Sequence, residues 1–89
     1  MKSYLITYDL NRSGQNYTVL VEKLKSFERY QHCMDSIWLV RTTDSAVQIR
    51  NFLKPCIDQN DELLIVELNS EAAWIGLGKR CVEWIKENL

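Results

Sequence analysis

The chain has 89 residues, which is enough for one domain with one hydrophobic core and too short for two. Its formal net charge is -1, so it lacks the basic excess that drives non-specific nucleic-acid binding, and any such binding must come from a local patch. No apolar run approaches the roughly 20 residues that cross a membrane, and the N-terminus lacks the apolar region of a signal peptide, so we expect a cytoplasmic protein outside the membrane.

The first predicted strand covers residues 3–10 and is rich in β-prone side chains. Asp9 stands near its carboxyl end, shortly before a turn signal at Ser13 and Gly14. A carboxylate at the end of a strand and beside a loop is well placed to meet a ligand. The alternative is that Asp9 accepts hydrogen bonds from the following turn.

A helix over residues 16–28 comes next, with Asn16 as its N-cap. Its apolar side chains recur at helical spacing and form one stripe for the core: Tyr17, Leu20, Val21, Leu24 and Phe27. Two short strands then follow at residues 30–33 and 36–41. We predict a hairpin with a tight connection at residues 34–35, and one long bent strand is the alternative.

Ser45 and Gln48 have the spacing of a capping box, which predicts the start of a second helix. Its apolar stripe comprises Ala46, Ile49, Phe52 and Leu53, and Pro55 should end it near Lys54. A nearly continuous apolar strand is predicted for residues 61–68, followed by a short strand at 72–75. The pattern of Cys81, Val82, Ile85 and Leu89 predicts a final amphipathic helix.

This order predicts an α+β protein, a ferredoxin-like βαββαβ sandwich with a C-terminal helix, as a single domain over residues 1–89. Both crossovers place helices on one face of the sheet. The alternating side chains of the strands are apolar on both faces, and a soluble monomer rarely exposes such a surface. We therefore expect the second face to be covered by the C-terminal segment, by a second subunit, or by both.

The three cysteines, Cys33, Cys56 and Cys81, are odd in number, widely spaced and without a C-x-x-C motif. This pattern predicts three reduced thiols rather than a disulfide framework. His32 and Cys33 are neighbours in a predicted strand, so their side chains point to opposite faces and do not share a metal ion.

Several segments resemble the Cas2/VapD superfamily and its small stand-alone Cas2-like members. Residues 8–10 (Y-D-L) resemble the Y-D-[ILV] signature, and residues 35–40 (D-S-I-W-L-V) resemble the Q-x-S-V-[FW] segment, with Ser36 and Trp38 matching and the Gln absent. Residues 53–55 (L-K-P) and 73–76 (A-W-I-G) match further segments of the stand-alone proteins.

The resemblance implies a ferredoxin-like homodimer joined through its sheets, with Asp9 near the dimer axis and Ser36 close to it. Members of the superfamily are associated with metal-dependent cleavage of RNA or DNA, and others are non-catalytic scaffolds or toxins. Two Asp9 carboxylates at a two-fold axis would suit Mg²⁺ or Mn²⁺, which prefers oxygen ligands. Arg12 and Arg41 are candidates for holding phosphates, and ordinary solvated surface is the alternative for both.

Two functions follow. The first is a Cas2-like homodimeric module that binds nucleic acid or a partner without catalysis. The second is a metal-dependent endonuclease, or a toxin-like endoribonuclease, that uses Asp9 across the dimer axis. The acidic composition and the missing Gln favour the first function, whereas Asp9 favours the second, so the sequence leaves enzyme activity open.

Overall fold

The computed structural model describes residues 1–11 and 17–89 and has an α+β architecture. Within these ranges no helix combines the length and apolar character that a membrane span requires. The helices and strands in chain order are β1 (Lys2–Asp9), α1 (Thr18–Leu24), β2 (Arg29–Met34), β3 (Ile37–Thr42), α2 (Ala46–Leu53), the 3₁₀ turn η1 (Lys54–Cys56), β4 (Glu62–Glu67) and α3 (Lys79–Asn88).

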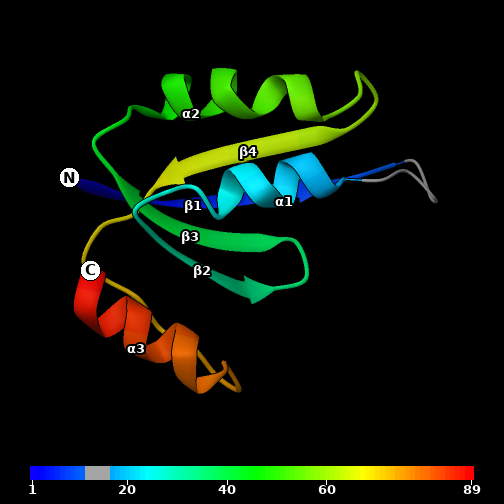
Figure 1. Cartoon of the computed structure of the whole chain (residues 1–89). Helices are drawn as coiled ribbons and strands as arrows, with labels where there is room; N and C mark the ends of the chain where they lie inside the picture. The colour runs from blue at the N-terminus through cyan, green and yellow to red at the C-terminus, as the bar shows by residue number, and fades with distance from the viewer. Residues whose placement is uncertain (12–16) are drawn as a thin grey trace.

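The four strands form one sheet in the order β2-β3-β1-β4, and every neighbouring pair is antiparallel (Figure 1). The strands β1 and β3 lie in the middle, whereas β2 and β4 are the edges. This order is compatible with the predicted ferredoxin-like arrangement. It brings the end of β1 beside the beginning of β4, although more than 50 residues of chain separate them.

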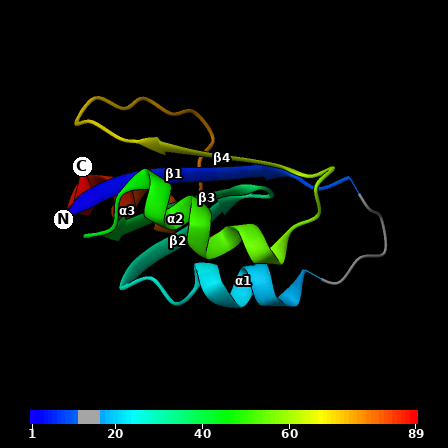
Figure 2. The same ribbon diagram turned by 90° about the horizontal axis from the view of Figure 1, so that it is seen from above.

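One face of the sheet, which we call the helix face, packs against α1 and α2 (Figure 2). The strands alternate in side-chain direction, so every second residue of β1 and β3 enters this core. Both helices contribute apolar stripes that their sequences predict, except that Phe52 of the second stripe is 40% exposed and stays outside the core. The fully or nearly fully buried members of the core are Tyr4, Ile6, Leu20, Leu24, Phe27, Trp38, Val40, Ile49 and Leu53.

Local sequence signals explain where several elements begin and end. The predicted capping box is confirmed, because the Ser45 hydroxyl accepts from the Gln48 backbone and the Gln48 side chain accepts from the Ser45 backbone. The helix α2 ends at Leu53, just before the 3₁₀ turn that contains Pro55. The hairpin of β2 and β3 is also confirmed.

Two predicted elements differ from the structure. The first helix is shorter than predicted and ends at Leu24, and the predicted cap Asn16 lies outside the described residues. The predicted strand at residues 72–75 does not form, and this segment belongs to an irregular connection that leads into α3. The sheet has free edges at β2 and β4, but this segment pairs with neither of them.

The second face of the sheet, which we call the α3 face, is covered only in part. The helix α3 packs on it against β2, on the side opposite to α1 and α2, and Asn88 at its end accepts a hydrogen bond from Arg41 of β3 (Figures 1 and 2). Leu39 lies on this face and is 5% exposed. On β4 at the other half, Leu64 is 56% exposed and Val66 is 44% exposed. The prediction that the C-terminal segment covers the second face is therefore confirmed for one half of it.

The prediction of three free thiols is wrong for two cysteines. Cys33 and Cys81 form a disulfide, with their Cα atoms 5.6 Å apart, and Cys56 is free. Cys33 lies in β2 at a register irregularity, and Cys81 lies in the first turn of α3. The packing of α3 on β2 brings together two cysteines that the spacing along the chain does not connect.

Candidate functional site

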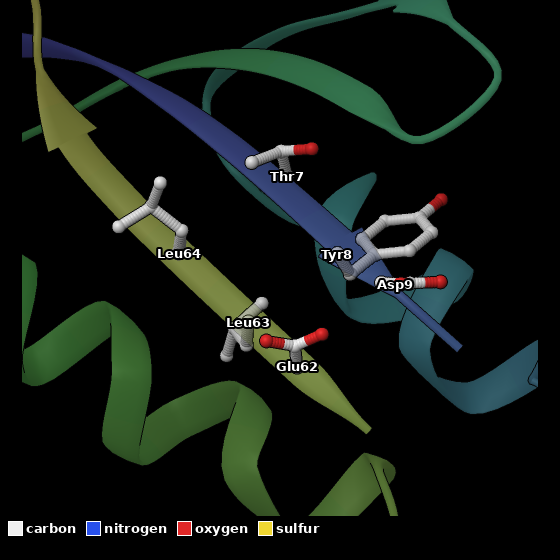
Figure 3. A pocket seen from close by; sticks show the side chains of 6 residues that line it. All are labelled: Thr7, Tyr8, Asp9, Glu62, Leu63 and Leu64. Carbon is white, nitrogen blue, oxygen red and sulfur yellow. The ribbon is translucent and has the colours of Figure 1, made fainter. Parts of the chain in front are cut away.

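Two acidic residues are paired where β1 ends and β4 begins. Asp9 is the last residue of β1 and Glu62 is the first residue of β4, and the antiparallel register pairs them directly. Residues paired in this way have Cβ atoms about 4.5–5.5 Å apart on the same face of a sheet. Both side chains are exposed. They line an open depression of about 420 Å³ together with Thr7, Tyr8, Leu63 and Leu64 (Figure 3).

A third carboxylate, Asp61, joins the loops on either side of this pair. One of its oxygens accepts from the backbone N–H of Asn11 at 2.8 Å. The other accepts from the Tyr17 hydroxyl at 3.0 Å and from the backbone N–H of Asp58 at 2.8 Å. The Asn11 side chain also donates to the backbone carbonyl of Asn60. Asp61 therefore ties the exit of β1 to the entrance of β4, which positions Asp9 and Glu62.

The chemistry of the pair suits a hard cation better than an anion. Two carboxylates directly opposite each other repel, and a divalent ion between them would remove this repulsion. Mg²⁺ and Mn²⁺ take oxygen ligands, and Mg²⁺ is commonly held by one or two carboxylates with water in its other positions. Within the described residues no group of three or more His, Cys, Asp or Glu side chains could hold a metal. One chain thus offers two carboxylates, and water would have to fill the remaining positions of a bound ion.

The predicted site residue Ser36 lies at the same end of the sheet as Asp9, in the turn between β2 and β3. It comes just before Ile37, the residue that pairs with Thr7. Ser36 does not line the depression around Asp9. The structure therefore places Ser36 at the same end of the sheet without bringing it into the Asp9 pocket.

Two of the segments that carry the family resemblance, residues 8–10 and 35–40, meet inside the core. The Trp38 indole N–H donates to the Tyr8 hydroxyl at 3.1 Å, and Trp38 is fully buried. The His32 ring stacks on Trp38, with centroids 4.1 Å apart and planes 7° apart. Tyr8 and Trp38 thus have a structural role on the helix face, and Asp9 is the residue of these motifs that reaches solvent on the α3 face.

The predicted phosphate ligand Arg41 lies near the opposite end of the sheet. It pairs with Ser3, six residues before Asp9 along β1, which corresponds to about 20 Å of strand. Its guanidinium donates to the Ser3 hydroxyl at 2.9 Å and to the Asn88 carbonyl at 3.0 Å. These bonds hold the C-terminal end of α3, where a cation is favourable. Arg41 and Asp9 are not brought together, and Arg12 lies outside the described residues.

Glu62 and Asp61 are the parts of this site that the sequence analysis missed. Both were assigned to a predicted strand without a function. The signal was the predicted ferredoxin-like fold, because in such a sheet the first and last strands are antiparallel neighbours, as they are here. That arrangement places the end of the first strand beside the start of the last one, although it does not specify the register.

Comparisons with family models, with curated proteins and with solved structures give no match for this chain. The structure itself shows an antiparallel sheet with helices on both faces, a half-open apolar face and a pair of carboxylates at one end.

Proposed function

We propose that this chain is a Cas2-like, ferredoxin-like module that works as a homodimer and binds its second copy through the α3 face. The observation that carries the proposal is the exposure of Leu64 and Val66 on β4, beside a sheet whose other half is covered. Neighbouring large apolar side chains on an open sheet face typically mark a binding surface.

A second copy suits this surface better than a nucleic acid. The register aligns Leu64 with Thr7 and Val66 with Leu5, so the open half presents mainly apolar side chains. The nearest charged pair on that face is Asp9 and Glu62, which would repel a phosphate backbone. Arg41 is engaged with α3. Binding of RNA or DNA stays a prediction, and the contacts of Arg41 do not support it.

The test compares two lysine substitutions of equal exposure on opposite sides of the molecule. Leu64 on the α3 face is 56% exposed, and Val47 on α2 is 55% exposed. Light scattering after size exclusion, in reducing and in non-reducing buffer, should give twice the 10.5 kDa chain mass for the wild type in at least one buffer. Leu64→Lys should then be monomeric, because it would bury an unpaired charge, and Val47→Lys should stay dimeric. A monomeric wild type in both buffers, or a dimeric Leu64→Lys, would refute the proposal.

A second candidate function is supported by the carboxylate pair. Asp9 and Glu62 would hold Mg²⁺ or Mn²⁺, and when bound the ion would supply a Lewis acid for cleavage of RNA or DNA. Two copies joined at the α3 face would present four carboxylates in place of two. The assay compares metal-dependent cleavage of single-stranded RNA and duplex DNA by the wild type and by Asp9→Asn, prepared in parallel. Equal cleavage by both proteins would remove Asp9 from the reaction.

A further inference from the structure

Three contacts hold the helix α3 on the sheet, one near its start, one in its middle and one at its end. Cys81, in its first turn, is bonded to Cys33 of β2. Trp84 in the middle is 8% exposed. At the last residue, the Asn88 carbonyl accepts from the Ser3 hydroxyl at 2.9 Å, and the Asn88 side chain accepts from Arg29 at 3.1 Å. One covalent bond, one buried ring and one polar cluster thus keep this helix in place.

The covalent attachment matters because little else restrains the N-terminal end of α3. The helix has ten residues, and the connection before it, residues 68–78, has no regular structure. An isolated helix of this length is marginal in water and depends on its packing. The disulfide joins residues 48 positions apart, so breaking it releases a large restraint on the chain.

The surface beneath α3 continues the open half of the α3 face. On β3, the neighbour of the strand β2 against which α3 packs, Leu39 is 5% exposed, and the register aligns it with Leu5 and then with the exposed Val66. Removing the helix would therefore extend one apolar row across β3, β1 and β4. Ile37, which is aligned with Thr7 and Leu64, would extend a second row in the same way.

The open half of the α3 face and the whole α3 face differ in area. This difference decides whether the protein binds a second copy better with α3 in place or with α3 released. Two six-residue strands project about 200 Å² of sheet and four strands about 400 Å², from strand spacings of roughly 4.8 Å and rises of roughly 3.3 Å. A stable interface buries about 800 Å² of accessible surface per partner, and accessible surface exceeds this flat projection. The open half alone falls well short of this area, whereas the whole face with its rim approaches it.

We propose that the Cys33–Cys81 disulfide is a redox latch that holds α3 over the α3 face and so controls docking of a second copy there. This inference rests on the proposed homodimer. A protein dithiol is the reductant: one thiolate attacks Cys33 on edge strand β2, and Cys81 leaves as a thiolate that takes up a proton. The second thiol of the reductant then displaces Cys33, which leaves as a thiolate and takes up a proton, while the reductant becomes a disulfide.

The experiment measures the helix and the association separately. Hydrogen exchange is followed in oxidised wild type, reduced wild type, Cys33→Ser and the matched control Cys56→Ser. In the reduced and Cys33→Ser proteins, α3 amides should exchange about thirtyfold faster or more, the factor that corresponds to the lower end of the stabilisation that a disulfide typically gives. Amides of α2 should lose less protection than those of α3 in these two samples. Light scattering should show tighter self-association of the reduced and Cys33→Ser proteins, with Cys56→Ser unchanged.

The possible outcomes separate the latch from the homodimer. Faster α3 exchange together with tighter association supports the latch. Unchanged α3 exchange, or a loss of α2 protection as large as that of α3, overturns it. A dimer of equal strength in both redox states overturns the latch and leaves the proposed function intact. If α3 amides exchange faster on reduction but the protein is monomeric in both redox states, redox-controlled docking and the proposed homodimer are overturned together.

Discussion

A conservative substitution at Asp61 should show that this residue stabilises the loops around the site, whereas the exposed acidic residues in the site contribute little to stability. Asp61→Asn keeps the shape of the side chain and removes its charge. The neighbouring change Glu62→Gln is chemically identical and serves as the matched control. The structure predicts opposite results, because Asp61 accepts from Asn11, Tyr17 and Asp58, whereas Glu62 is an exposed partner of Asp9.

The expected loss in the free energy of unfolding follows from the hydrogen bonds that the Asp61 carboxylate accepts. In Asp61→Asn an amide NH₂ takes one of the two oxygen positions and meets a donor. If it replaces Oδ2, the Tyr17 hydroxyl can rotate to accept, but the bond from the Asp58 N–H is lost; if it replaces Oδ1, the bond from the Asn11 N–H is lost instead. A part-buried donor left without a partner costs about 1–3 kcal/mol, and the remaining bonds lose their charge assistance. We expect a loss of about 2 kcal/mol, which lowers the melting temperature of a domain this size by roughly 8–16 °C.

The control should change stability by less than about 0.5 kcal/mol, as exposed substitutions usually do, and removing the repulsion from Asp9 favours the folded state. Thermal and urea unfolding followed by circular dichroism measures both variants under identical conditions. The reasoning about Asp61 fails if Asp61→Asn melts within about 2 °C of the wild type, well below the expected shift. It also fails if Glu62→Gln loses as much stability as Asp61→Asn.

Three further predictions concern stability. The free energy of unfolding of Asp9→Asn should lie within about 0.5 kcal/mol of the wild-type value, because Asp9 is exposed and is paired with a residue of like charge. A loss of about 1 kcal/mol or more in urea unfolding would instead mean that Asp9 supports its turn. Ile49→Ala should cost about 2–5 kcal/mol because Ile49 is fully buried, whereas Val47→Ala on the same helix should cost less than about 0.5 kcal/mol; similar urea midpoints for the two would contradict the assigned core. Gly76→Ala should cost about 1 kcal/mol because Gly76 has φ of 72°, and Gly78→Ala, at φ of -63°, should cost a few tenths; calorimetry that ranks them the other way would count against this backbone conformation.

Much of the secondary structure can be read from local patterns, because those patterns act over a few residues. The capping box of Ser45 and Gln48 and the stop before Pro55 depend on neighbouring backbone groups, so the sequence determines them. The alternation of the strands determined that both faces of the sheet carry apolar side chains. The same alternation placed His32 and Cys33 on opposite faces, where one stacks on Trp38 and the other is bonded to α3.

Contacts between distant segments were decided only by the tertiary structure. The pairing of Asp9 with Glu62 depends on the register of two strands that are far apart in the chain, and a shift of one residue would turn one of them to the other face. The use of Arg41 as an anchor for α3, and the bond between Cys33 and Cys81, depend on where that helix packs. No periodicity in the sequence encodes that position, because it results from the balance of burial and hydrogen bonding over the whole α3 face.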